Sequence, residues 1–243
     1  MRTLPVACLP ALLFALAAVP VRAAPGTGPA LHASVAVVSD YRARGISYSD
    51  GDPALQGEVH LGGGGWFASA FGSSVQGLGG SGELDFTAGL TKRLPLIDAS
   101  FGATLYSWPG SGRPVAPELF ATASLPLGPA TATVGATWSP ADGGPLDSSR
   151  YFFGTLRAGL PLLPVSLKAS VGHEAIAAVG ADGRARHGKW DWQLGGDLRQ
   201  GPFTLGVSYA RHSLGRGPLL FDGGRFESGA SQGKLLFRLQ AGF

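Results

Sequence analysis

Apolar and polar residues alternate with a period of two along most of the chain. The C-terminal segment shows this pattern most clearly. Counting back from Phe243, the residues Ala241, Leu239, Phe237 and Leu235 are apolar, while the residues between them are mostly small or polar. Successive side chains of an extended strand point to opposite faces, so the pattern predicts a strand with one apolar and one polar face. No segment after the N-terminal region shows the 3.6-residue period of an amphipathic helix.

The same alternation predicts twelve strands along the chain. They cover about 33–42, 53–61, 65–74, 82–93, 97–107, 117–125, 130–139, 150–160, 164–173, 189–200, 202–211 and 233–243. Five short turns and six long loops alternate strictly between them, which leaves both chain ends on the short-turn side. Short turns at one end and long loops at the other are typical of a bacterial outer-membrane barrel. We therefore expect an all-β, 12-stranded antiparallel transmembrane up-and-down β-barrel.

The composition supports a membrane protein that crosses with strands. Of the 243 residues, 39 are glycine, 14% are charged and 44% are hydrophobic. Beyond residue 23, no apolar run reaches the roughly 18 residues that a transmembrane helix needs. Residues 1–23 have the features of a signal peptide, because Arg2 precedes an apolar stretch and a cleavage site of the small-residue type ends at Ala23. We expect a signal peptide over 1–23, export through the Sec pathway, and a single outer-membrane barrel domain over 24–243 in a Gram-negative bacterium.

Cysteine usage and net charge limit the possible chemistry. Cys8 is the only cysteine and lies inside the expected signal peptide. The mature chain would therefore have neither a disulfide framework nor a thiolate metal site. Removing Arg2 and Arg22 from the 19 basic residues leaves 17 against 16 acidic residues, a net charge of +1, which gives no sign of nucleic-acid binding. We expect no cofactor and no metal.

The expected partners follow from the barrel. They are outer-membrane lipid, small solutes, and the barrel-assembly machinery, which would read the C-terminal strand that ends in Phe243. We expect no nucleic-acid partner.

Charged residues in the predicted strands fall mostly on the polar face. A charge that faces lipid at mid-depth costs about 2–4 kcal/mol, so these side chains should point into the lumen. The candidate pore-lining and selectivity residues are Asp40, Arg42, Arg44, Glu58, Glu83, Asp85, Glu118, Arg157, Lys168, Lys234 and Arg238.

The first and last strands must be neighbours in a closed barrel, which groups some of these charges. Arg42, Lys234 and Arg238 would form a basic strip that could guide anions. The acidic residues Glu83, Asp85 and Glu118 could form an opposed strip. The alternative is that all these charges only pair with and hydrate one another.

A twelve-stranded barrel has a narrow interior, because the lumen diameter rises with the number of strands. We therefore expect a porin-like channel for passive diffusion of small hydrophilic solutes or ions, and no enzymatic activity. One alternative is a closed structural or adhesion barrel. Another is an outer-membrane hydrolase that uses His173 or His212, the latter next to Ser213. A third is a soluble β-sandwich.

A family resemblance begins near the end of the first predicted strand. Residues 38–47 read V-S-D-Y-R-A-R-G-I-S, and residues 52–57 read D-P-A-L-Q-G. The two segments resemble the opening of the TorF family of candidate porins, which has V-S-D-Y-x-x-R-G-I-S followed by D-x-P-A-x-Q-G. The resemblance covers about 23 residues, 35–57, and implies an outer-membrane barrel with porin activity, without naming a solute.

The same segment can also be interpreted without the family. Asp40 could orient Arg42 or Arg44 at the outer mouth through a charge-assisted hydrogen bond. Alternatively, these residues could form a structural clamp that holds the first long loop.

Overall fold

The computed structural model describes residues 29–75, 82–112, 114–140, 148–179, 185–213, 219–221, 224–226 and 233–243. The expected signal peptide lies outside these residues. Within this part of the chain, no helix has the length and apolarity needed to cross a membrane. The strands of the barrel are β1 (Ala30–Val38), β4 (Ala54–Gly63), β5 (Trp66–Ser74), β6 (Gly82–Arg93), β7 (Asp98–Ser107), β8 (Ala116–Leu127), β9 (Ala130–Ser139), β10 (Ser149–Gly159), β11 (Val165–Val179), β12 (Ala185–Gln200), β13 (Phe203–His212) and β16 (Lys234–Gly242).

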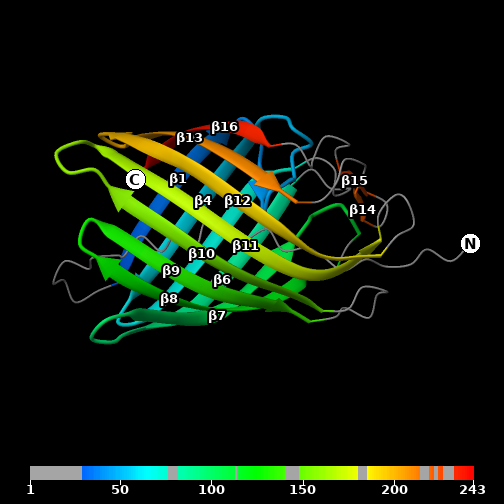
Figure 1. Ribbon diagram of the computed structural model, residues 1–243, viewed down its shortest axis with the longest axis horizontal. Coiled ribbons are helices and arrows are strands. Elements are labelled where there is room, and N and C mark those ends of the chain that lie inside the picture. The colour runs from blue at the N-terminus through cyan, green and yellow to red at the C-terminus, as the bar shows by residue number, and fades with distance from the viewer. Residues whose placement is uncertain are drawn as a thin grey trace, which may run out of the picture.

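These twelve strands form one closed barrel in which each strand pairs antiparallel with its neighbours (Figure 1). The ring closes where β1 pairs with β16, for example through Val37 and Leu239, and on its other side with β4. Closure leaves no strand edge unpaired, which is what a sheet in hydrocarbon requires. The predicted fold class, a 12-stranded antiparallel up-and-down barrel of the transmembrane type, is confirmed.

The two faces of the barrel wall differ sharply in polarity. The outward positions carry exposed apolar side chains on every strand, among them Trp192, Leu205 and Leu239, which are 39–53% exposed. The inward positions carry buried polar side chains such as Thr104 and Ser208. A soluble monomer rarely exposes a continuous apolar belt of this extent, whereas lipid covers it.

Aromatic rings fill part of the interior. Trp66 points outward, while Phe67 and Phe71 on the same strand pack inside, Phe67 with its ring centroid 6.1 Å from that of Phe120. The sequence of β5 alone leaves open whether a bulge or a partly filled lumen explains this pattern. The register across β4, β5 and β6 is continuous, which excludes a bulge, so side chains that fill part of the lumen explain the pattern.

Inward glycines make room for these rings. A Cβ atom on Gly172 would overlap the Tyr151 hydroxyl, and one on Gly135 would overlap the Phe153 ring. Small inward residues therefore accommodate aromatic side chains here, and do not simply widen a water path.

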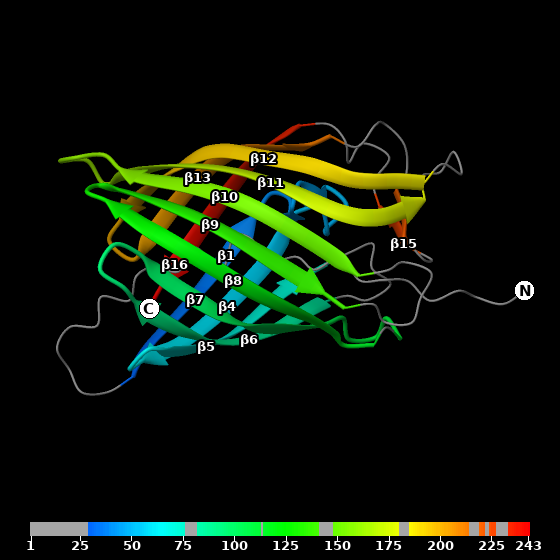
Figure 2. The ribbon, with the colours of Figure 1, turned by 60° about the horizontal axis from the view of Figure 1, so that its bottom comes forward.

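The two ends of the barrel are unlike. Short turns lie at the end where β16 finishes, at the left of Figure 1, and the long connections lie at the other end. That end also carries the hairpin of β14 (Leu219–Phe221) and β15 (Gly224–Phe226). Figure 2 shows β11 and β12 running beyond their neighbours at this end (Figure 2).

Two predicted boundaries are wrong. The loop predicted over 174–188 is largely strand, because β11 and β12 continue their pairing past a register shift between Glu174 and Ala177. The first strand, predicted to reach residue 42, ends at Val38. Just beyond it, side-chain hydrogen bonds to Asp40 turn the chain out of the ladder.

Candidate functional site

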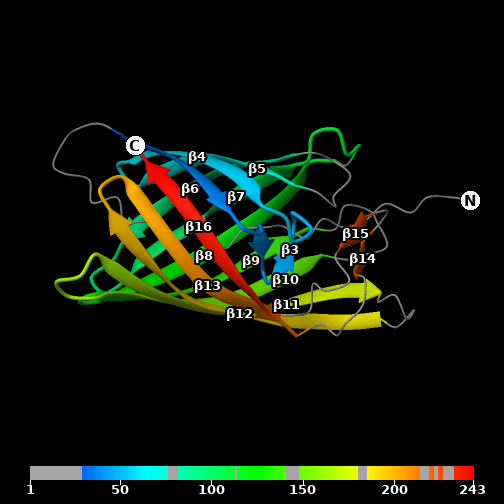
Figure 3. The same cartoon turned by 90° about the horizontal axis from the view of Figure 1, so that it is seen from above.

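The connection between β1 and β4, residues 39–53, folds into the barrel, and we call it the inner loop. It carries the short strands β2 (Arg42–Ala43) and β3 (Ile46–Ser47). Figure 3 labels β3 within the outline of the barrel, near the long-loop end (Figure 3). Its apolar residues Tyr41, Ile46 and Tyr48 are buried. The bore is therefore narrowed by a segment of the chain itself.

Asp40 is the residue that turns the chain inward. Its carboxylate accepts hydrogen bonds from Arg42 Nε at 2.6 Å, from Ser49 Oγ at 3.2 Å and from Ser47 Oγ. Lys234 Nζ of β16 lies 3.5 Å from the same carboxylate and donates to the Gly51 carbonyl at 2.8 Å. Local side-chain bonds of this kind compete with strand pairing and favour turns.

The tip of the inner loop is pressed against the barrel wall. Arg44 and Gly45 form the two-residue turn between β2 and β3 with φ values of 48° and 79°, the positive values that tight hairpin turns require. A Cβ atom on Gly45 would lie 2.9 Å from the Cβ of His212 and 3.2 Å from that of Asp191. Only glycine satisfies both the backbone conformation and this close approach.

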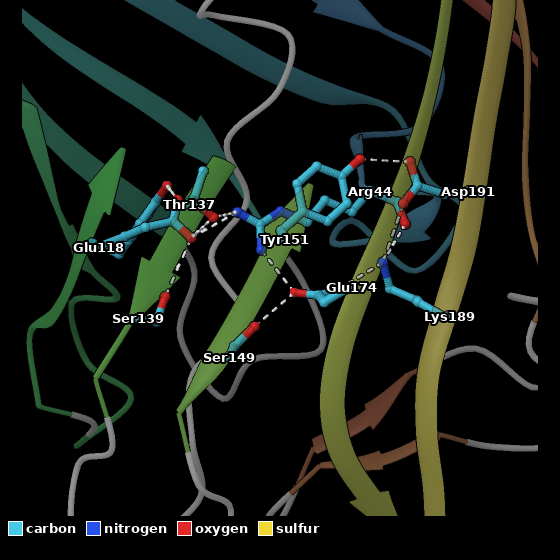
Figure 4. Close-up of polar contacts among 10 residues, drawn as sticks. Arg44, Glu118, Thr137, Ser139, Ser149, Tyr151, Glu174, Lys189 and Asp191 are labelled. Atoms are coloured by element: carbon cyan, nitrogen blue, oxygen red, sulfur yellow. Dashed lines mark hydrogen bonds and ion pairs between the residues drawn. The ribbon is translucent and has the colours of Figure 1, made fainter. Parts of the chain in front are cut away.

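Arg44 anchors the tip to strands on the far side of the bore. Its Nη2 lies 2.7 Å from Glu118 Oε2 of β8, and its Nη1 lies 2.7 Å from Glu174 Oε1 of β11. The guanidinium carbon stands 4.4 Å above the ring of Tyr151 on β10. Figure 4 shows Arg44 among the side chains that hold it (Figure 4).

Arg44 lies in the inner loop, outside the membrane-spanning strands. Burial lowers the pKa of this guanidinium, but Glu118 and Glu174 raise it more, so the pKa is well above its ordinary value. The two carboxylates therefore stabilise the charged form of Arg44.

A second cation and several hydroxyl groups complete this network. Lys189 Nζ of β12 lies 2.8 Å from Glu174 Oε2 and donates to the Arg44 carbonyl at 2.9 Å. The Tyr151 hydroxyl donates to Asp191 at 3.0 Å, and the Tyr106 hydroxyl donates to Glu118 at 3.0 Å. The inner loop is thus held by β8, β10, β11 and β12. Thr137 of β9 also bonds Arg44 and Glu118.

A second group of charges, which we call the Asp197 cluster, lies nearer the short-turn end. Asp197 of β12 lies 3.0 Å from Lys168 Nζ of β11, 3.1 Å from Arg238 Nη2 of β16 and 3.9 Å from Arg157 Nη1 of β10. Three cations therefore surround one carboxylate. Gly206 allows this arrangement, since a Cβ atom there would lie 2.7 Å from Asp197 Oδ1.

A cavity of about 140 Å³ separates the inner loop from the Asp197 cluster. The side of the cavity formed by the inner loop consists of Asp40, Tyr41 and Arg42. One wall carries Lys168 and Arg238. The lining also includes the uncharged polar side chains of Gln56, Gln193 and Gln240.

Acidic residues occupy the other side of the bore. Glu83 and Asp85 of β6 are almost fully buried, and Asp85 and Glu58 of β4 line the cavity. The charge of Asp85 interacts with those of Glu83 and Glu118. Glu118 itself is already neutralised by Arg44.

Ten of the eleven candidate residues inferred from the sequence fall into four groups in the structure, one of which is the pair of Arg44 and Glu118. The eleventh, Glu58, lines the cavity. Arg42 and Lys234 both bind Asp40, while Arg238 belongs with Arg157 and Lys168 around Asp197, so the expected basic strip divides into two clusters. The acidic residues Glu83 and Asp85 remain together on β6. Of the two interpretations offered for Asp40 and Arg42, the contacts favour the clamp that holds the first long loop.

Phe243 lies at the short-turn end and closes the ring. Its backbone N–H donates to the Ala33 carbonyl at 2.8 Å, and its side chain is 77% exposed. The C-terminal aromatic side chain is therefore free to contact lipid or another protein.

Several residues that hold the site together do not stand out in the sequence. The predicted loop includes Glu174. The alternation places Lys189 and Asp197 on the polar face of their strand, but it singles out neither of them, nor Tyr151, as a site residue. All four occupy inward positions of paired strands. The signal that could have found Glu174 is the alternation of β11 and β12, which, extended by a few residues, places Glu174 opposite Lys189.

The histidines considered for hydrolysis lie on different sides of the wall. The ring of His173 packs 4.7 Å from that of Trp190, whose side chain is exposed on the outer face. His212 is buried on the inner face beside Gly45. Ser213 Oγ accepts a hydrogen bond from the Trp190 backbone N–H at 2.9 Å.

Comparison with known proteins relates the chain to one family and one fold. Residues 22–242 match the model of a bacterial protein family of unknown function, Gcw_chp. A search of curated proteins gives no match. Among solved structures, the NanC porin has a TM-score of 0.57 and 11% identity, with 88% of this chain and 99% of that chain covered.

Two further solved structures are similar. The KdgM porin has a TM-score of 0.52 and 7% identity over 88% of this chain and 98% of that chain. An outer-membrane channel from Pseudomonas putida F1 has a TM-score of 0.50 and 17% identity over 89% and 96%. Identities this low establish a shared fold and nothing finer.

Proposed function

The chain belongs to the Gcw_chp family of bacterial proteins of unknown function, and we propose that it is a porin-like channel of the outer membrane for passive diffusion of small hydrophilic solutes or ions. The observation that carries the proposal is the polar bore inside a closed barrel with an apolar outer belt. The similar folds of proteins described as porins support it. The resemblance of residues 38–57 to the TorF family of candidate porins points the same way.

The inner loop sets the width of the proposed path. It projects from β1 and is fastened on the opposite strands by Arg44, so solutes must pass beside it. A constriction formed by ion-paired side chains restricts passage to small solutes and exposes them to charged walls. The charged groups at this level and at the Asp197 cluster are the proposed selectivity residues.

Location and assembly are part of the proposal. We assign the short turns to the periplasmic side and the long loops to the outside, as in known outer-membrane barrels. Export would use the Sec pathway, with residues 1–23 removed. The exposed Phe243 side chain at the end of β16 would serve as the signal for the barrel-assembly machinery. The proposal gives the protein no catalytic step.

A closed structural or adhesion barrel is the second candidate. The observation that favours it is the buried network of Arg44, Glu118, Glu174 and Lys189, which fills one level of the bore.

Conductance separates the two candidates. The protein, refolded in detergent and added to planar lipid bilayers, should produce discrete current steps. Liposomes that contain it should swell in small sugars and amino acids, and more slowly as solute size grows. Folded protein, identified by its heat-modifiable gel migration, that gives neither current steps nor swelling would establish the closed barrel.

A further inference from the structure

The cavity between the inner loop and the Asp197 cluster has walls of opposite charge. Its acidic wall is β6, where Asp85 lines the cavity with 2% of its surface exposed. Neither carboxylate oxygen of Asp85 accepts a hydrogen bond from any residue that the structure describes. A buried carboxylate without a donor is costly, so Asp85 is suited to receive a cationic or donating group of a solute.

The basic wall lies across the cavity. Arg238 and Lys168 line it and share Asp197 as their counter-charge, and Arg157 Nη1 lies 3.9 Å from the same carboxylate. The Nε of Arg238 is buried and has no acceptor within the described ranges. Glu58 also lines the cavity, but it interacts with Arg238 only at longer range. Among the contacts of the described residues, these three cations share the single carboxylate of Asp197, so an anionic group is the natural complement.

The two walls face each other because of the strand order. Asp197 lies on β12 and Asp85 on β6, and five strands separate β12 from β6 in either direction round the ring. These strands therefore lie on opposite sides of the barrel. Between the walls, Gln56, Gln193 and Gln240 offer neutral donors and acceptors.

We propose that this cavity binds small zwitterionic solutes of the amino-acid type, with the ammonium group at Asp85 and the carboxylate at Arg238 and Lys168. A simple anion leaves Asp85 without a donor, and a simple cation leaves the basic wall without its complement. Only a solute that carries both charges satisfies both walls. This inference rests on the proposed channel function, for which it names a class of solute.

Calorimetric titration of the detergent-refolded protein tests the site without requiring transport. The probes are glycine, γ-aminobutyrate and ε-aminocaproate, which separate the two charges by increasing lengths. Butyrate and butylammonium are the single-charge controls. The best of the three zwitterions should bind with a dissociation constant at least about tenfold below those of both controls. Equal or tighter binding of butyrate, or no binding of any zwitterion, would overturn the proposal.

Two variants test which wall of the cavity binds which charged group of the solute. Asp85→Asn should fold as well as the wild type, because it removes a buried unpaired charge. It should weaken binding of the zwitterion about tenfold and leave butyrate binding unchanged. Arg238→Gln, which leaves Asp197 paired with Lys168, should weaken binding of the zwitterion and of butyrate. Arg93→Gln, at an exposed position outside the cavity, should change neither. Zwitterion binding that is unaffected by Asp85→Asn contradicts the assignment.

Failure of this inference and failure of the proposed channel give different results. Protein that binds the zwitterion but never conducts is a closed barrel with a solute site. Protein that conducts but binds no zwitterion is a channel without this site.

Discussion

Arg44 Nη2 lies 2.7 Å from Glu118 Oε2, although 74 residues separate the two in the chain, and both side chains are about 1% exposed. This ion pair joins a loop that leaves β1 to β8 on the far side of the barrel. Buried pairs contribute little net stability, but removal of one partner leaves a buried charge uncompensated. Arg44 is therefore the residue whose loss should most directly free the inner loop.

Replacement of Arg44 by methionine should release the inner loop from the bore. Glu118 and Glu174 lose their shared cation, and breaking a buried pair in this way costs about 3–5 kcal/mol. Single-channel conductance should rise by roughly twofold or more, since a wider constriction conducts better. Arg93→Met is the matched control, because Arg93 pairs with Asp98 at an exposed site. An unchanged conductance in folded Arg44→Met protein would show that the loop does not limit the current.

Gly45→Ala should displace the tip of the loop for a steric reason. The new methyl group meets His212 and Asp191, and the residue has a φ of 79°. Gly110→Ala is the control, since Gly110 has a φ of 81° but nothing lies within 4 Å of the place that its Cβ atom would take. In both variants the positive φ should lower the free energy of unfolding by about 1–2 kcal/mol, which urea unfolding in vesicles measures. Only Gly45→Ala should also change the conductance.

The adjacent residues Gln193 and Leu194 test which solvent covers each face of the wall. Leu194 is 65% exposed on the outer face, and Gln193 lines the cavity. Leu194→Arg should lower the free energy of unfolding in lipid vesicles by about 2–4 kcal/mol, the cost of arginine at the bilayer midplane. Gln193→Arg should cost much less, because its charge enters a polar bore. Equal losses would mean that the outer face does not contact hydrocarbon.

Asp197→Asn should shift ion selectivity toward anions. The change removes the carboxylate shared by Arg157, Lys168 and Arg238 and leaves their charges uncompensated along the bore. The reversal potential in planar bilayers under a salt gradient measures the effect. Asp98→Asn, which alters a pair at the short-turn end of the wall, should leave the reversal potential close to that of the wild type. A shift toward cations would contradict the role given to the cluster.

The barrel could be predicted from the sequence because its signals are local. Alternation in β12, β13 and β16 places Leu194, Leu205 and Leu239 on one face, and each strand carries this information within about ten residues. The order of short turns and long loops then determines which strands are neighbours. The outward position of these side chains in the closed ring confirms that part of the interpretation.

The inner loop could not be predicted because its contacts are distant in sequence. Arg44 and Glu118 are both candidate pore residues from the sequence, but nothing in either segment indicates that they meet. The inward turn depends on Asp40 binding Ser47 and Ser49 together, where a simple continuation of the alternation predicts a longer strand. Similarly, Gly135 suggests open space, whereas a phenylalanine ring occupies it.

Cysteine substitution at two adjacent positions tests the whole account most directly. The sequence has no cysteine other than Cys8, which lies in the segment expected to be removed, so Leu239→Cys and Gln240→Cys each introduce a single thiol. Leu239 is on the outer face, and Gln240 lines the cavity. During current recording in planar bilayers, a charged, water-soluble methanethiosulfonate should reduce the conductance of Gln240→Cys stepwise and leave that of Leu239→Cys unchanged. The same response at both positions, or a response only at Leu239→Cys, would contradict a lipid-embedded barrel whose interior carries the current.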